Sequence, residues 1–163
     1  MSKSQYKETN EQLIEKLKKE NYNIILDLGC GKNIYKKHIT NIIGIDKYPE
    51  YMTFGKVNAD IIADIGDLPF KNETVDAILT LGGIGEPPED TTMKVLDKQI
   101  KEIKRVLKPK GVVYGRTRNK LLMDKDIFVV ISNKFDFEIL CYKDIQKNGN
   151  PLDIRTYWEW KKK

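Results

Sequence analysis

Cysteine, histidine and arginine are scarce in this chain of 163 residues. The two cysteines, Cys30 and Cys141, are far apart, and no neighbouring residues complete a zinc-like spacing. We therefore expect reduced thiols, no disulfide framework and no metal site. The single histidine, His38, is expected to have a surface or structural role rather than to titrate in catalysis.

Long apolar runs are missing as well. No run approaches the ~18 residues that a membrane span needs, and the N-terminus, MSKSQYKETNEQ, is too polar for a signal peptide. These absences predict a cytoplasmic protein that does not associate with a membrane. The chain is 40% hydrophobic and 33% charged, which is typical of a globular domain with a core of its own.

Arginine accounts for only four of the 29 basic residues: Arg105, Arg116, Arg118 and Arg155. The net charge of +5 invites a nucleic-acid function, because phosphates attract basic surfaces. Dedicated phosphate recognition usually relies on arginine forks. The excess of lysine therefore favours a solvated lysine surface, while RNA stays open as a partner.

Helical and strand patterns alternate along the chain. Apolar spacing predicts helices over residues 9–20, 34–39, 90–107 and 123–133. In the last of these, the run IFVVI alone could also pass as a strand. Strands are predicted over residues 24–28, 41–47, 60–63, 75–83, 111–117, 137–143 and 154–161.

This order of elements predicts the fold class. Strands followed by helices form a doubly wound α/β sheet, and such sheets bind ligands beyond the carboxyl ends of their strands. The last two strands are joined through a turn cluster at residues 148–151, a connection too short for a crossover helix. We therefore expect this closing pair to be antiparallel.

The segment NIILDLGCGKN, residues 23–33, ends the first predicted strand in a glycine turn. A dinucleotide site requires the pattern G-x-G-x-x-G. Gly29 and Gly31 match its first two glycines, but Ile34 stands at the position of the third glycine. The phosphate-loop pattern is absent. Asp27 favours another ligand, because a carboxylate repels phosphate and attracts an ammonium group.

Two further acids end neighbouring predicted strands. Asp46 can accept from ribose hydroxyls, and Asp64 can accept from an adenine amine while Ile65 packs against the ring. Each acid taken alone could simply cap a turn or a helix. Together with Asp27, they fit a cationic nucleoside with an amino-acid end better than a dinucleotide.

At these residues the sequence resembles the class I S-adenosylmethionine-dependent methyltransferases. The matching segments, in chain order, are LDLGCGKN, IIGIDKYP, ADIGDLPFKNETVDAILT and EIKRVLKPKGVVYG. Asn33 stands where a third glycine is usual, and Lys110 replaces the first glycine of an LKPGG motif. The resemblance implies methyl transfer with S-adenosylmethionine as cofactor, and a Rossmann-like seven-stranded sheet of order 3-2-1-4-5-7-6.

The resemblance also implies a division of the single domain. Residues 1–21 would form an N-terminal helix, 22–117 the cofactor-binding half, and 118–163 a C-terminal helix and hairpin. The glycine segment would contact the methionine part of the cofactor. The end of the second strand would bind the ribose, the end of the third strand the adenine, and the end of the fourth strand would lie beside the sulfonium. The implied cofactor-binding residues are Asp27, Gly29, Cys30, Gly31, Asp46, Lys47, Asp64, Ile65, Leu81 and Gly82.

The acceptor side carries weaker signals. Glu86 could act as a general base or be a solvated loop acid, and Arg116 and Arg118 could grip a phosphate or carboxylate or lie at the surface. A base is needed only if the acceptor must lose a proton. The N-P-P-[YF] and K-D-K-E signatures of two subclasses are missing, so RNA and small molecules both stay open as acceptors.

Other functions also stay open. The chain could be a non-catalytic cofactor-binding subunit that needs a partner protein or a homodimer, or could cleave the same cofactor. A nicotinamide oxidoreductase is the outside alternative. The alternation of Tyr157, Trp158 and Trp160 predicts one packed and one partly exposed face, with an aromatic platform as a further possibility.

Overall fold

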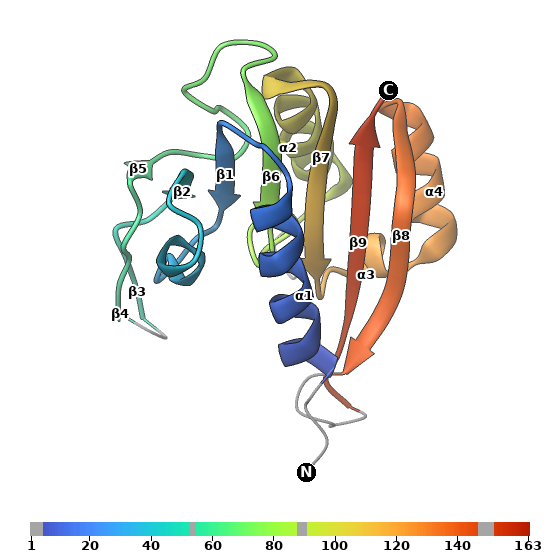
Figure 1. Ribbon diagram of the computed structural model, residues 1–163. Helices are drawn as coiled ribbons and strands as arrows, with labels where there is room; N and C mark the ends of the chain where they lie inside the picture. The colour runs from blue at the N-terminus through green and yellow to red at the C-terminus, as the bar shows by residue number, and fades with distance from the viewer. Residues whose placement is uncertain (1–4, 53–54, 88–90, 147–151) are drawn as a thin grey trace.

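The computed structural model describes residues 5–52, 55–87, 91–146 and 152–163. Within these ranges the chain forms a seven-stranded sheet and a separate two-stranded hairpin (Figure 1). The strand order of the main sheet is β5-β2-β1-β6-β7-β9-β8. Their bounds are β1 Ile25–Leu28, β2 Ile42–Asp46, β5 Ile61–Ile62, β6 Val75–Thr80, β7 Leu107–Thr117, β8 Phe137–Gln146 and β9 Ile154–Lys162.

The strand directions confirm the predicted doubly wound sheet. The five strands β5, β2, β1, β6 and β7 run parallel, and β9 pairs antiparallel with both β7 and β8. The observed order equals the predicted 3-2-1-4-5-7-6 once the small hairpin is left out of the count. That hairpin, β3 Glu50–Tyr51 and β4 Gly55–Lys56, was not predicted, because each strand is only two residues long.

One face of the sheet is covered by α1 Gln5–Lys19 and the short 3-10 helix η1 Ile34–Lys37. Leu13 and Leu17 of α1 are buried against a cluster that includes Ile25 of β1 and Tyr114 of β7. The predicted helix start at residue 9 was wrong. Thr9 lies inside the helix, where its hydroxyl donates to the carbonyl of Gln5 rather than capping the end.

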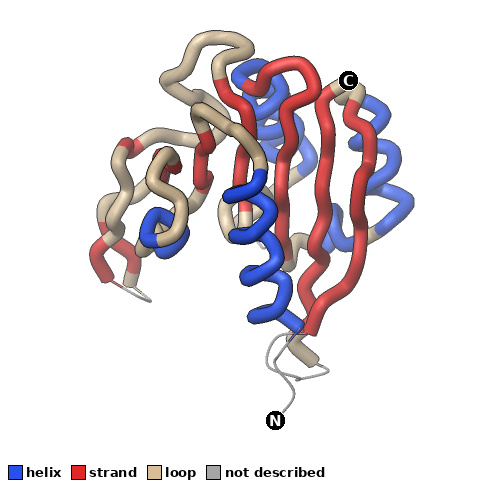
Figure 2. The backbone as a smooth tube through the Cα atoms, in the orientation of Figure 1, coloured by secondary structure: helices blue, strands red, loops and turns tan. Residues whose placement is uncertain are grey.

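The opposite face is covered by α2 Met93–Val106, α3 Lys120–Met123 and α4 Lys125–Lys134 (Figures 1 and 2). The helix predicted over 123–133 is confirmed as α4, which begins at Lys125 because Asp124 caps it by accepting from the N–H groups of Asp126 and Ile127. The short α3 before it was not predicted. The predicted strand at 111–117 begins earlier, at Leu107, directly after α2. The predicted helix start at residue 90 and the predicted turn at 148–151 lie outside the described residues.

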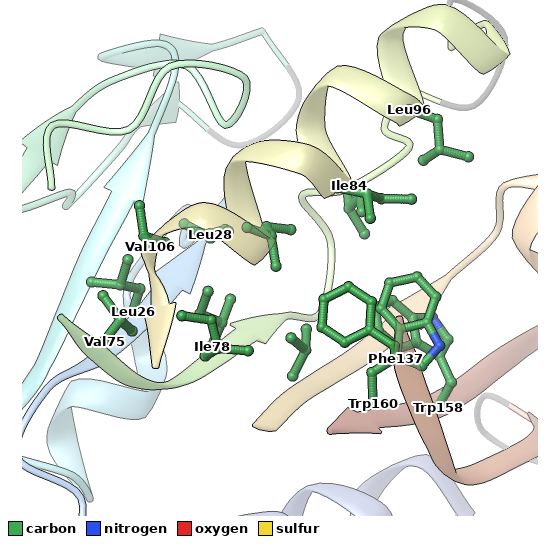
Figure 3. Close-up of a cluster of buried hydrophobic side chains, with 14 of the residues drawn as sticks. Leu26, Leu28, Val75, Ile78, Ile84, Leu96, Val106, Phe137, Trp158 and Trp160 are labelled. Carbon is green, nitrogen blue, oxygen red and sulfur yellow. The ribbon is translucent and has the colours of Figure 1, made fainter. Parts of the chain in front are cut away.

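The larger core lies under α2 and α4, and Figure 3 shows its side chains. Trp158 and Trp160 are fully buried, with ring centroids 4.3 Å apart, and Phe137 stacks on Trp160 at 5.0 Å. Tyr157, on the other side of β9, is also only 5% exposed. The predicted partial exposure of these aromatic residues is therefore wrong: the three rings are core, and none offers a platform for a base.

Among the described residues, no helix has the length and apolar character required to cross a membrane.

Candidate functional site

The glycine turn after β1 is shaped by a backbone contact with the loop after β6. Gly29 and Gly31 have positive φ, 73° and 51°. A Cβ on Gly29 would lie 2.6 Å from the Cα of Gly83, and one on Gly83 would lie 2.3 Å from the carbonyl oxygen of Leu28. Neither position has room for a side chain. Gly82, by contrast, has no atom within 4 Å of its would-be Cβ, so this glycine borders open space.

Asn33 occupies the place of the usual third glycine. It adopts a left-handed conformation, φ 52°, and its amide donates to the carbonyl of Asn58 at 3.1 Å and to Asp60 at 3.2 Å. A Cβ on Gly44 of β2 would come within 2.5 Å of that amide nitrogen. In this chain, the glycine that lets the turn pack closely against the sheet is therefore Gly44 of the strand.

Asp46, at the end of β2, is 3% exposed and ties the two strand ends together. Its Oδ2 accepts the backbone N–H of Gly31 at 2.9 Å. Its Oδ1 accepts the N–H of Lys47 at 2.8 Å and the hydroxyl of Tyr51 at 2.6 Å. Burial raises the pKa of Tyr51, so this hydroxyl keeps its proton and donates it to the carboxylate.

Asp27 is the second buried acid, in β1 and 3% exposed. Loss of solvation raises the pKa of Asp27 to about 7, the negative charge of Asp46 adds to the rise, and Arg116 opposes it. Burial, with the charge of Asp27, also raises the pKa of Cys30 to about 12. Cys30 is therefore a thiol rather than a nucleophilic thiolate at neutral pH.

Asp64 and Lys47 join the ends of β5 and β2. Oδ1 of Asp64 accepts the N–H of Gly66 at 2.7 Å, and Oδ2 lies 2.9 Å from the ammonium group of Lys47. The hydrogen bond from Lys47 is the main cause of the lowered pKa of Asp64. Ile65 is partly buried and packs against the larger core. These contacts tie the segment after β5 to the end of β2.

A cavity of about 320 Å³ lies beside the ends of β6 and β7 and the start of β9. It brings together residues predicted for two roles, Leu81 and Gly82 on the cofactor side and Glu86, Arg116 and Arg118 on the acceptor side. Sequence reasoning missed Thr117 and Arg155, which also line it. Asp27, Asp46 and Asp64 do not line this cavity, and His38 is exposed.

Arg155 lies at the cavity because β9 is antiparallel. Thr156 pairs with Thr117 at the end of β7, so the start of β9 lies at the carboxyl edge of the parallel strands (Figure 1). The predicted antiparallel pairing of the last two strands already implied that the start of β9 lies at this edge. In the described part of the chain, no group of three or more His, Cys, Asp or Glu residues is placed to hold a metal ion.

Residues 26–115, more than half of the 163, match the family model of the methyltransferase domain. The chain belongs to the class I S-adenosylmethionine-dependent methyltransferases. The cofactor of this family is S-adenosylmethionine. The match spans the segment from β1 through β7, the part of the methyltransferase domain that carries the glycine turn, Asp46 and the β6 loop. Comparison with curated protein sequences finds no match.

Solved methyltransferases share the fold at low sequence identity. One from Methanosarcina mazei is 16% identical, with a TM-score of 0.68 over 92% of this chain and 96% of that one. The 1,6-didemethyltoxoflavin N1-methyltransferase of Burkholderia thailandensis, solved with S-adenosylhomocysteine, is 10% identical, with a TM-score of 0.69 over 93% and 75%. A Haloferax volcanii methyltransferase complexed with the activator Trm112 is 13% identical, with a TM-score of 0.70 over 94% and 88%.

Proposed function

We propose that this methyltransferase catalyses methyl transfer from S-adenosylmethionine to an acceptor, with the cofactor held at the carboxyl ends of β1, β2, β5 and β6. The observation that carries the proposal is Asp46. This buried carboxylate already accepts a hydroxyl at 2.6 Å, the kind of hydrogen bond that a ribose hydroxyl makes. It lies in the family-matching segment and braces the glycine turn through Gly31.

The remaining roles follow the geometry around Asp46. Gly29, Cys30 and Gly31 would offer backbone groups to the methionine part, and Asp27 would stabilise its ammonium group. Lys47 would hold Asp64 in position at 2.9 Å, with Asp64 and Ile65 beside the adenine. Leu81 and Gly82 would border the sulfonium, where open space at Gly82 leaves room for it.

When bound, S-adenosylmethionine supplies an activated methyl group. The protein's contribution is then to position the acceptor and exclude water. Glu86 lines the cavity, and its Oε2 lies 3.4 Å from a guanidinium nitrogen of Arg118. This contact would orient Glu86 to take a proton from an acceptor that must lose one.

The test is calorimetry of the purified protein with S-adenosylhomocysteine and with NAD, followed by turnover of methyl-labelled S-adenosylmethionine with a small-molecule extract or with RNA. We expect S-adenosylhomocysteine to bind, NAD not to bind, and S-adenosylhomocysteine to be the product. Binding of NAD alone would refute the proposal. Formation of methylthioadenosine or homoserine lactone would indicate cofactor cleavage instead.

A second candidate is a methyltransferase that needs a partner protein. It is supported by the likeness to the Haloferax volcanii methyltransferase in complex with its activator. Turnover by the purified chain alone would rule this requirement out. The division into residues 1–21, 22–117 and 118–163 is part of the proposal, and the cytoplasmic location stays a prediction.

A further inference from the structure

Three of the four arginines of the chain line one cavity. The sequence has 29 basic residues, of which four are arginines. Among the described residues, the basic members of the cavity lining are Arg116, Arg118 and Arg155, with no lysine. The planar guanidinium fork matches phosphate and carboxylate oxygens in a way that an ammonium group cannot. The scarce residue type is therefore concentrated at one site.

The three arginines reach the cavity from two strand ends and are held there by different partners. Arg116 of β7 is buried and donates to Oδ1 of Asn10 at 2.7 Å. Arg118 meets Glu86 at 3.4 Å, and Arg155 of β9 lies 3.1 Å from Asp153. The contact with Asn10 holds the buried Arg116 in place before any ligand arrives, which lowers the entropy lost on binding.

The lining carries an excess of positive charge. Among the described residues, the lining has three guanidinium groups and one carboxylate, Glu86, while Asp153 pairs with Arg155 from outside the lining. In a concave site, such an excess attracts an anionic group more strongly than the same charges do on an open surface. The lysines in the described part of the chain do not share this arrangement, since none of them lines the cavity.

The size and position of the cavity identify the class of ligand. Its volume of about 320 Å³ is that of a small-molecule site, for which ~300–1,000 Å³ is usual. Leu81 and Gly82, which the proposed function sets beside the sulfonium, belong to the same lining. A small anion held by the arginines would therefore lie next to the methyl group.

We propose that the methyl acceptor is a small molecule with a phosphate or carboxylate group, and that Arg118 and Arg155 bind this group. The inference rests on the proposed function, because it takes the cavity to be the acceptor side of the cofactor site. Arg116 is buried beneath the site, and the exposed Arg118 and the partly buried Arg155 make the contacts with the anion.

The experiment measures anion binding by calorimetry on the protein saturated with S-adenosylhomocysteine. The probes are inorganic phosphate and succinate, which distinguish a phosphate site from a carboxylate site. The variants are Arg118→Gln and Arg155→Gln, with Lys101→Gln as control, since it removes the same charge from the exposed face of α2. Arg155→Lys keeps the charge without the fork, and a thermal melt verifies that each variant folds.

We expect at least one probe to bind, and each arginine-to-glutamine change to weaken it by about tenfold or more. Lys101→Gln should leave the affinity within about twofold, and Arg155→Lys should fall between wild type and Arg155→Gln. S-adenosylhomocysteine should bind equally well to every variant, because none of these residues is assigned to the cofactor.

Four results would overturn the proposal. If S-adenosylhomocysteine binds but neither anion does, or if anion binding survives both glutamine changes, the acceptor assignment is wrong and the proposed function stands. If S-adenosylhomocysteine does not bind, the proposed function itself fails. If a short labelled RNA binds more tightly than phosphate and loses binding in the same variants, the acceptor is RNA rather than a small molecule.

Discussion

Asp46 is the residue on which the glycine turn and the end of β2 converge. Both of its oxygens are engaged, by Gly31 on one side and by Lys47 and Tyr51 on the other. A carboxylate has about four acceptor positions, and only the hydroxyl of Tyr51 comes from a side chain that can turn away. In the proposed cofactor site, a ribose hydroxyl would therefore take the place of Tyr51 without disturbing the turn.

Asp46→Ala should weaken S-adenosylhomocysteine binding by about 1–3 kcal/mol, because the backbone donors and the ribose hydroxyls lose their buried acceptor. Calorimetry measures the change. Asp126→Ala, at an exposed position in the first turn of α4, is the control and should leave the affinity unaltered. An unchanged affinity in Asp46→Ala would mean that the ribose lies elsewhere.

Asp27 should make cofactor affinity depend on pH. Its pKa in the free protein is raised to about 7, and the ammonium group of the cofactor favours the ionised form. The complex then has the lower pKa, so affinity rises with pH until about pH 7 and is flat above it. Calorimetry with S-adenosylhomocysteine should give about a tenfold gain between pH 6 and pH 8.

Asp27→Asn should remove this pH dependence. The neighbours that share the environment of Asp27 are Asp46, Arg116 and Cys30, and all three are unchanged in the variant. A dependence of equal size in Asp27→Asn would assign the titration to another group.

At the scale of elements, the loops after β1 and β6 form one unit, because Gly29 and Gly83 meet backbone to backbone. Gly83→Ala should destabilise the fold by about 1–3 kcal/mol, the usual cost of overpacking, since its Cβ would fall 2.3 Å from the carbonyl oxygen of Leu28. Denaturant unfolding measures the loss.

Gly82→Ala is the matched control for this pair of loops. Its Cβ would enter open space, so stability should stay within about 0.5 kcal/mol of wild type. Cofactor affinity should nevertheless fall, because the added methyl group occupies the space proposed for the sulfonium. Equal stability of Gly82→Ala and Gly83→Ala would contradict the close packing of the loops.

The order of the sheet and the place of the acids could be predicted from the sequence, and smaller elements could not. Runs such as Ile24–Leu28 are apolar on both sides, and short connections leave few topologies, so the strand ends and Asp46 follow. The hairpin β3–β4 could not be predicted, because two-residue strands leave no periodicity. The packing of Asn33 could not be predicted either, because it depends on the absence of a side chain at Gly44 in β2.

Arg155 is a different kind of omission. Its residue type carried the signal, since arginine is rare in this chain, and the predicted antiparallel pair implied that β9 begins at the ligand edge. The aromatic residues of β9 are the stronger pattern in its sequence, and they mask the arginine at its start. Those residues are core, as their burial requires.

At the scale of the whole molecule, ligand binding and folding are linked. A ligand that binds only the folded state adds about 2.7 kcal/mol at 100 times its dissociation constant. S-adenosylhomocysteine should therefore raise the melting temperature in a thermal shift assay, whereas NAD at the same concentration should not. A shift that is equal for the two ligands would count against the cofactor pocket and favour a general nucleotide site.

The pairing of Asn33 with Gly44 has a consequence for how this family can vary. The amide of Asn33 fills the space above Gly44, so bulk at one position excludes bulk at the other. Gly44→Ala should be harmful alone and tolerated when combined with Asn33→Gly, a reciprocal exchange of volume between a loop and a strand. In related sequences the two positions should covary, with a small residue at 44 wherever 33 carries a side chain.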